Sequence, residues 1–337
     1  MTTIVRLVTF SILLCLTAAS SAAAATYGGD ATGAEVTVTA TGTTVRAATG
    51  SLSISGGMAE ASLPVGDIPS SATGGAVSFA ASALHSAVIG TGGTTRAEAS
   101  LGAVGLTVSG NQITADFLMA RSAASCGPSV AGSSEILNLV VNGQTISVTG
   151  APNQTVSLPN GSVIINAQVP TIDGTSGQLS VTALRVLTHD TITGAPIADV
   201  LATTVDARID CAAGSSPGEE WISGGGWIPG ENGVGRATFG FVAGPGGSPY
   251  RGHLTLKDSN GTTIHATVIT QATMCNGTGG DSTFTVQDTN NNVFEVIVND
   301  TAEPGAGVDS FSINGPGYSN AGQLAQGNIQ AHGFTCH

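Results

Sequence analysis

Apolar and polar residues alternate along most of this 337-residue chain, and that pattern limits the fold more than any other feature. Segments such as Val36–Val38, Leu179–Val181 and Phe284–Val286 place an apolar side chain at every second position. Side chains of a β-strand point alternately to two faces, so this spacing gives each strand one apolar face. Gly, Asn, Asp and Pro separate the segments, as they do at turns. The sequence therefore predicts an all-β protein.

Residues 137–148 contain the clearest hairpin signal. Asn142 and Gly143 fit a two-residue turn in which both central residues need positive φ. This turn pairs Val141 with Gln144. The same register pairs Leu139 with Ile146 and Leu137 with Val148, which places the large apolar side chains on one face.

Two further turns are predicted in the C-terminal third. Asp258–Gly261 connects the strand signals 252–257 and 262–269, where loops of two, three or four residues all fit. Asp288–Asn292 begins like a calcium-binding EF-hand loop, but Val293 stands where that loop needs Gly. We interpret 288–292 as a hairpin turn.

The N-terminus is typical of a secretory signal peptide. Arg6 precedes the apolar run Leu7–Ala19, and Ala23–Ala25 fits a cleavage site before Thr26. The run is shorter than the roughly 20 residues that cross a bilayer. We therefore expect residues 1–25 to be removed. The mature chain, without a transmembrane segment, should be secreted, either extracellular or loosely associated with the cell surface.

Four cysteines remain after cleavage, and an oxidising compartment favours disulfides between them. They are Cys126, Cys211, Cys275 and Cys336, and they allow three connectivities. We favour Cys126–Cys211 with Cys275–Cys336, because this pairing keeps each bridge on one side of the linker described next.

Residues 212–220 have no apolar periodicity and concentrate Gly, Ser and Pro, so we expect a linker there. This linker would separate residues 26–211 from residues 221–337, and both lengths lie within the usual size of a domain. The prediction is two tandem antiparallel β-sandwich-like domains after a cleaved signal peptide.

The charge balance excludes one class of partner. Lys and Arg number 9 against 22 Asp and Glu, which gives a net charge of −13. Proteins that bind nucleic acid present clustered cations to the phosphates, and this chain lacks them. Nucleic acid is therefore not an expected partner.

Two groups of residues are candidates for metal binding. Asp300, Glu303 and Asp309 crowd one stretch and carry the hard oxygen ligands that Ca²⁺ prefers; the alternative is a solvated acidic loop. His253, His265 and His332 could supply imidazole to zinc, although their wide spacing equally fits ordinary histidines of a sheet or surface; all six residues are C-terminal to the linker.

Two motifs resemble catalytic loops in their residue pattern but not in their sequence context. Residues 214–218 match the G-x-S-x-G pattern of a nucleophile elbow, but they fall in the predicted linker, without the strand and helix that the elbow needs. Gly224–Gly226 lacks the Lys and helix of a phosphate-binding loop. We interpret that glycine run as a tight turn or bulge that holds Trp227 in the core.

Part of the chain resembles a known family. Segments 140–146, 149–156 and 163–166, with flanking cysteines, are similar to the core of the bacterial choice-of-anchor P family over about residues 35–211. Residues 221–337 resemble the small β domain that follows such modules in some bacterial proteins. The resemblance implies an exported bacterial protein, surface-associated or released, and supplies no catalytic residues.

Together these observations lead us to expect an exported, non-catalytic protein with a structural or adhesive role. Its partners would be cell-envelope components or carbohydrate, and no cofactor is expected apart from the Ca²⁺ considered above. Two alternatives remain open. One is a secreted carbohydrate-active hydrolase that uses carboxylates of the C-terminal domain, and the other is a Ca²⁺-dependent binding module. Two facing carboxylates in a cleft would favour the hydrolase, and a flat face rich in Thr and Ser would favour the structural role.

Overall fold

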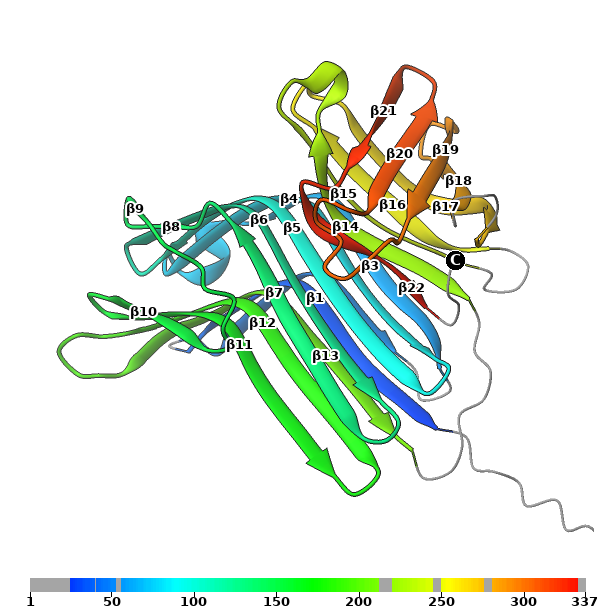
Figure 1. Cartoon of the computed structure of the whole chain (residues 1–337). Coiled ribbons are helices and arrows are strands. Elements are labelled where there is room, and N and C mark those ends of the chain that lie inside the picture. Colours follow the sequence, from blue (N-terminus) through cyan, green and yellow to red (C-terminus); the bar gives the residue numbers. More distant parts are fainter. Residues whose placement is uncertain are drawn as a thin grey trace, which may run out of the picture.

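The computed structural model describes residues 25–39, 41–52, 56–211, 220–244, 250–275 and 281–332. Its strands pair antiparallel into three sheets, which confirms the all-β prediction (Figure 1). Within these residues, helical structure is limited to two short 3₁₀ segments, η1 (Ser70–Thr73) and η2 (Glu231–Gly233). The described part of the chain has no helix of the length and apolarity that a membrane span requires.

The strands of each sheet follow a simple order. Sheet A runs β10 (Gln154–Leu158), β11 (Gly161–Asp173), β12 (Ser176–His189), β13 (Pro196–Asp210), β1 (Thr26–Val38) and β2 (Thr43–Leu52). Sheet B runs β3 (Gly57–Ile68), β4 (Val77–Thr91), β5 (Thr94–Val108), β6 (Asn111–Ser125), β8 (Val140–Val141) and β9 (Gln144–Thr145), with β7 (Ser129–Leu137) also paired to β6.

Sheet C contains the remaining strands, all from residues 221–332. Its order is β21 (Tyr318–Gln323), β20 (Ser310–Gly315), β19 (Val293–Asn299), β18 (Ser282–Asp288), β17 (Thr263–Thr273), β16 (Arg251–Asp258), β15 (Arg236–Gly244), β14 (Trp221–Pro229) and β22 (Gln326–His332). The chain's last described strand thus returns to pair with the first strand of its own sheet.

The three sheets form layers. Sheets A and B lie face to face, and their inward residues, such as Val36 and Leu184 from sheet A and Phe79 and Leu118 from sheet B, form one large apolar core. Sheet C covers part of the other face of sheet B, where β14, β15 and β16 contact β3, β4 and β5 (Figure 1). Sheet B is therefore the middle layer.

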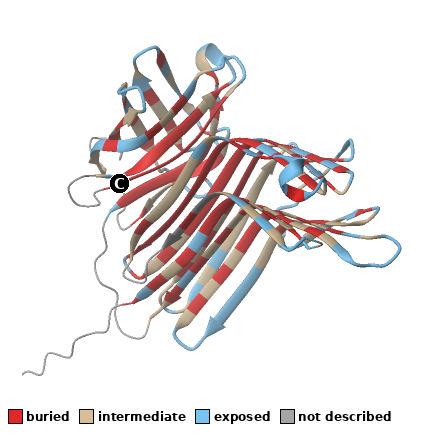
Figure 2. Cartoon of the chain, turned by 180° about the vertical axis from the view of Figure 1, so that it is seen from behind, coloured by how far each residue is buried: buried red, intermediate tan, exposed pale blue. Residues whose placement is uncertain are grey.

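The burial pattern of strand β4 reflects the position of sheet B between the other two sheets. From Ala81 to Thr91 every residue is buried, although an isolated sandwich strand would alternate. A strand covered on both faces has no solvent side and becomes continuously buried. The burial pattern along the central strands is visible in Figure 2, where exposed residues concentrate in loops and strand ends.

Sheet C curls into a half-barrel around a core of its own (Figure 1). Five phenylalanines lie in this core, and the rings of Phe239 and Phe311 stack with centroids 3.9 Å apart. Phe241 stacks on Phe284 at 5.2 Å. Because the curl brings strands distant in the sheet into contact, one sheet can enclose an apolar interior.

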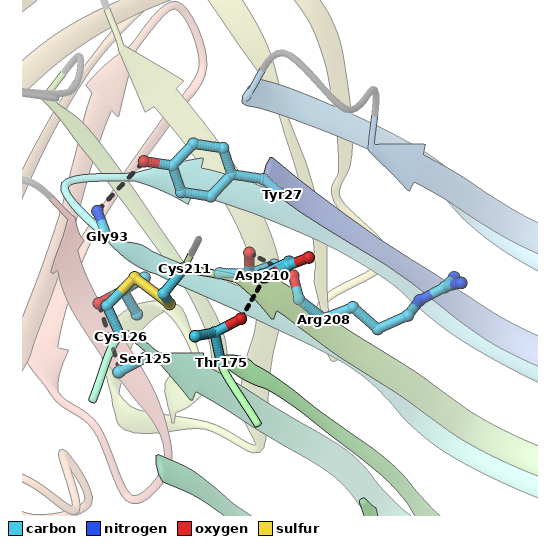
Figure 3. The surroundings of a disulfide bond; sticks show 10 residues. Tyr27, Gly93, Ser125, Cys126, Thr175, Arg208, Asp210 and Cys211 are labelled. Atoms are coloured by element: carbon cyan, nitrogen blue, oxygen red, sulfur yellow. Dashed lines mark hydrogen bonds between the residues drawn. A yellow bond between two sulfur atoms is a disulfide. The ribbon is translucent and has the colours of Figure 1, made fainter. Parts of the chain in front are cut away.

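A disulfide joins the two layers of the sandwich at one end. Cys126 follows β6 of sheet B and Cys211 follows β13 of sheet A, and the structure contains the bond between them, as favoured from the sequence. Figure 3 shows its surroundings: Tyr27 accepts a hydrogen bond from the Gly93 amide at 3.2 Å, and Thr175 donates to Asp210 at 2.8 Å. The other predicted bridge, Cys275–Cys336, involves Cys336, which lies outside the described residues.

The predicted hairpin at 137–148 is confirmed at its turn and shortened at its arms. Asn142 and Gly143 have φ of 50° and 80°, and Val141 pairs with Gln144. Leu137, however, pairs with Phe117 as the end of β7, so its predicted pairing with Val148 is wrong. Asn138, at φ 53°, separates the two strands, and the sequence pattern alone does not show this break.

The two C-terminal turns are confirmed. Lys257 pairs with Thr263, and the Asp258 amide donates to the Thr262 carbonyl at 2.9 Å, which fixes the register left open by the sequence. Gln287 pairs with Val293 across the 288–292 turn. The Asp288 carboxylate accepts hydrogen bonds from the amides of Asn290 and Asn292 within this turn.

Residues 1–24 and 212–219 lie outside the described residues. The predicted signal peptide and nearly all of the predicted linker fall there, so cleavage and the domain boundary stay predictions. The glycine run 224–226 is inside strand β14, so its interpretation as a turn or bulge is wrong. A Cβ on Gly225 would lie 2.5 Å from Ser100 Oγ of sheet B, which shows that glycine there permits close approach of the two sheets.

Candidate functional site

The face of sheet B that turns toward sheet C is charged, unlike the apolar face toward sheet A. Strand register aligns its side chains in cross-strand rows. One row runs Glu60, Ala87, Glu98, Arg121 and Ser133. The next row runs Met58, Ile89, Arg96, Ala123 and Ala131. Period-2 alternation sends these residues to one side and the sandwich core to the other.

Two buried histidines connect this face to sheet C. His85 of β4 and His253 of β16 are both fully buried, and His85 Nδ1 lies 2.9 Å from His253 Nε2. At the far side of His85, its Nε2 lies 3.0 Å from Glu98 Oε1. His253 Nδ1 forms an ion pair with Glu60. Four titratable side chains from β3, β16, β4 and β5 therefore form one chain of contacts.

The pKa shifts of Glu60 and Glu98, the carboxylates at the two ends of this row of contacts, favour the ionised form of both. Burial opposes ionisation of Glu98 and Glu60, but the hydrogen bond and charge of His85 outweigh it at Glu98, and those of His253 do so at Glu60; both pKa values are lowered. Burial lowers the pKa of His253. Each of these contacts is a hydrogen bond only where one of its two facing atoms carries a proton, so the contacts constrain which ring nitrogens are protonated.

Glu98 also connects the His–Glu contacts to a second pair of side chains, Ser223 and His332. Ser223 of β14 hydrogen-bonds Glu98, and Ser223 Oγ lies 2.8 Å from His332 Nε2 of β22. An ionised carboxylate only accepts hydrogen bonds, so Ser223 donates to Glu98 and accepts from His332 Nε2–H. The remaining atom, His332 Nδ1, is buried and has no hydrogen-bond partner in the part of the chain that the structure describes.

This Ser–His pair lacks the electrostatics of a nucleophile and its base. Burial, followed by the charge of Arg96, lowers the pKa of His332 to about 3. A general base works best with a pKa near the operating pH, and a carboxylate on the far ring nitrogen normally raises it. Here Glu98 contacts the serine instead. The pair therefore fits a buried hydrogen-bond network better than nucleophilic catalysis.

A hollow of about 420 Å³ opens beside this network. Its floor is the two cross-strand rows of sheet B from β4 to β7. Its opposite wall is the edge of sheet C and the loop after β19, including Ser223, His332, Gln330, Glu303 and Pro304. Small side chains on the floor leave the space, because alanine reaches less far from a sheet than its neighbours do.

The residues proposed for Ca²⁺ lie together at this loop, and their oxygens already accept hydrogen bonds. The buried Asp309 accepts from the amides of Thr301 and Ile329 at 2.9 Å each. Asp300 accepts from the amide of Ala331 at 2.8 Å. Burial is the largest cause that raises the pKa of both aspartates. Calcium binding here stays a prediction.

Glu303 faces the hollow from the same loop. It accepts a hydrogen bond from Gln330 at 2.7 Å and pairs with Arg121 at 3.4 Å. Arg121 also pairs with Glu135 at 3.0 Å. The acidic loop is thus attached to sheet B by a shared arginine.

The three histidines proposed for zinc do not share a contact, and two of them have separate partners. His253 contacts His85 and Glu60, whereas His332 contacts Ser223. The buried Nδ1 of His265 has no hydrogen-bond partner within the described ranges, and burial lowers the pKa of this ring. Among the residues that the structure describes, no three His, Cys, Asp or Glu side chains are arranged as a metal site.

Sequence reasoning missed Glu60, His85, Glu98 and Ser223. One signal was present: residues 81–91 are continuously apolar or small except for His85, which indicates a strand buried on both faces with a histidine that needs a partner. The partners come from strands far away in the sequence. The 214–218 motif lies outside the described residues.

A second surface of interest is the face of sheet A directed away from sheet B. Asp206 at its centre accepts hydrogen bonds from Gln178 and Ser180, both at 2.9 Å, and pairs with Arg208. Arg208 also pairs with Asp30 of β1 at 2.6 Å. Elsewhere on the sheet, threonines bond across strands, as in Thr182–Thr204 and Thr37–Thr44. This face is a broad surface of hydroxyl, amide and charged groups.

Comparisons with known proteins identify no family for this chain. No family model matches the chain, and no curated protein matches it. A solved structure described as a "putative AttH" from Nitrosomonas europaea covers 91% of this chain and 92% of its own, at 10% sequence identity and a TM-score of 0.23. A TM-score that low carries no argument about fold or function.

Proposed function

We propose that this chain is an exported, non-catalytic protein of bacterial type with a structural or adhesive role at the cell surface or in the extracellular medium. The observation that carries the proposal is the outer face of sheet A. It offers hydrogen-bonding groups over several adjacent strands, in the pattern expected for contact with cell-envelope components or carbohydrate. Polysaccharide chains present repeated hydroxyls, and the polar face of a sheet can bond them repeatedly.

Two further points support a non-catalytic role. The low pKa of His332 leaves Ser223 without an effective base. Each buried carboxylate of the His–Glu network at the B–C interface contacts a histidine, as in a structural network.

The same proposal includes the finer organisation. Residues 26–211 would form a choice-of-anchor P-like β domain and residues 221–337 a small second β domain, joined by 212–220. The source of this division is the sequence pattern and the family resemblance. Limited proteolysis of the mature chain should cut within 212–220 and leave two protected fragments.

The adhesive role is tested by co-sedimentation of the mature chain with insoluble cell-envelope polysaccharide. The double variant Gln178→Ala/Ser180→Ala removes two groups from the outer face of sheet A. Thr267→Ala/Gln271→Ala is the matched control, because both residues are exposed on sheet C. We expect the first variant to sediment several-fold less than wild type and the control to match it. Equal sedimentation of all three proteins would reject the outer face as the adhesive surface.

A hydrolase is the second candidate, and one observation favours it: Glu98 and Glu303 line the same hollow. Glycosidases place two carboxylates on either side of the scissile bond. Glu98 has a lowered pKa because of His85, so it would be the base or nucleophile. Hydrolysis of chromogenic glycosides that Glu303→Gln abolishes would establish this function in place of the first.

A further inference from the structure

The hollow beside the His–Glu network contains an arginine without a counter-ion. Arg96 projects from β5 into the row Ile89, Arg96, Ala123, Ala131, so its nearest cross-strand neighbours are Ile89 and Ala123. It is half-buried, and no carboxylate lies within salt-bridge distance of it in the described part of the chain.

Comparison with the other arginines of the described chain shows that a half-buried arginine without a salt bridge is unusual in this protein. Five of them form salt bridges: Arg46, Arg121, Arg185, Arg208 and Arg236. Arg251 forms none, but it is exposed and therefore solvated by water. Arg96 alone among these arginines is both withdrawn from solvent and without a salt bridge. Asp300 lies beyond salt-bridge distance of Arg96, whose charge only partly offsets the burial that raises the pKa of Asp300.

The surroundings of Arg96 are apolar on one side and polar on the other. Ile89, Ala123 and Ala131 lie beside it on the floor, and Pro304 lies on the opposite wall. His332, also on that wall, has a buried Nδ1 with no hydrogen-bond partner among the described residues. A buried polar atom without a partner calls for an explanation, and a bound molecule that supplies the partner is one such explanation.

The size of the hollow fits a small molecule. Its volume of about 420 Å³ is within the usual range of ligand sites. An arginine fork matches a carboxylate in geometry and charge, and partial burial strengthens that hydrogen bond. Apolar floor residues would cover the rest of the ligand.

We propose that this hollow is a binding site for a small carboxylate with an apolar body, with Arg96 bonding the carboxylate and the Ile89–Ala131 row contacting the apolar part. Arg121 does not compete for the ligand, because Glu135 and Glu303 already pair with it. The site is separate from the outer face of sheet A and does not depend on an adhesive role.

Isothermal titration calorimetry with sodium octanoate on the full mature chain tests the proposal. We expect saturable binding of one octanoate per chain and at least tenfold weaker binding to Arg96→Gln. Arg251→Gln removes the same charge at an exposed site and should bind like wild type. Octan-1-ol has the same chain without the carboxylate and should bind at least tenfold more weakly than octanoate.

A second variant tests the apolar part without changing charge. Ala123→Leu fills the floor beside Arg96 and should weaken octanoate binding several-fold, with an unchanged circular dichroism spectrum and an unchanged melting temperature as evidence of folding. Absence of saturable octanoate binding to wild type would overturn the proposal. Equal loss in Arg96→Gln and Arg251→Gln would overturn it as well, since the effect would then come from net charge. Octan-1-ol binding as tight as octanoate binding would reject the carboxylate site.

Discussion

His85 Nδ1 and His253 Nε2 lie 2.9 Å apart, although the residues belong to different sheets and stand 168 positions apart in the sequence. A hydrogen bond between two imidazoles requires one ring to donate and the other to accept. A proton on both facing nitrogens would break it, and a proton on neither would leave two lone pairs in contact. The contact between sheets B and C therefore depends on how many protons this histidine pair holds.

Removal of His85 should destabilise the fold strongly. His85→Leu leaves the buried Glu98 without its imidazole partner, and breaking a buried charge pair costs about 3–5 kcal/mol. Urea unfolding measures the change. Glu98→Gln combined with His85→Leu removes the buried charge as well and should recover part of the loss. If the double variant loses the sum of the two single losses, the residues are not coupled.

Acid should unfold the protein partly through His332. Its pKa is lowered to about 3 in the folded chain, while an unfolded histidine titrates near about 6.5. The unfolded state then binds more protons between these values, so the unfolding free energy falls as the pH decreases from about 6.5 to about 3. Arg96 and Glu98 from β5 and Ser223 from β14 are the polar groups that face this ring.

His332→Gln is the variant that isolates this effect. Glutamine stays neutral, so the variant should lose less stability than wild type over that pH range, a difference on the order of a few kcal/mol. Denaturant unfolding at pH 4 and pH 7 gives the comparison. Parallel pH dependence in the two proteins would show that His332 does not stay neutral in the folded chain.

Gly240 should tolerate no side chain. A Cβ at this position of β15 would collide with the Cβ of His85, so Gly240→Ala has to push sheet C away from sheet B. We expect a loss of about 1–3 kcal/mol, the usual cost of overpacking. Gly105→Ala is the control, because this strand glycine has no atom within 4 Å of a built Cβ. Thermal melting of both variants should separate them, and equal melting temperatures would contradict the close approach.

The disulfide prediction can be checked directly by non-reducing peptide mapping. The map should contain a Cys126–Cys211 peptide, and the sequence predicts a Cys275–Cys336 peptide beside it. In the loop-closure model, a bridge across 85 residues stabilises by about 4–5 kcal/mol, so Cys126→Ser/Cys211→Ser should melt at a clearly lower temperature. A Cys211–Cys275 peptide would contradict both the structure and the predicted domain division.

Local sequence features were sufficient for much of the fold. The turn at Asn142–Gly143 and the pairing of Val141 with Gln144 follow from two residues that accept positive φ next to strand-forming ones. The end of β7 at Leu137 could not be predicted in this way, because its partner Phe117 is supplied by another strand. The glycine run 224–226 was misinterpreted as a turn for a similar reason: glycine is required there by Ser100 and the strands on either side, not by backbone conformation.

The sequence by itself determined the strand class and the hairpin turns, because alternation and turn chemistry act within short stretches. It left three disulfide connectivities open and favoured Cys126–Cys211 only through the predicted linker. Only the tertiary structure decided that sheet C lies on sheet B, and with it the contact of Glu60, His85 and Glu98 with His253, Ser223 and His332. Each of these residues alone is compatible with an exposed strand position. The pKa values of Glu60, Glu98, His253 and His332 shift only when the two sheets pack together and exclude water between them, and that exclusion depends on packing between strands far apart in the chain.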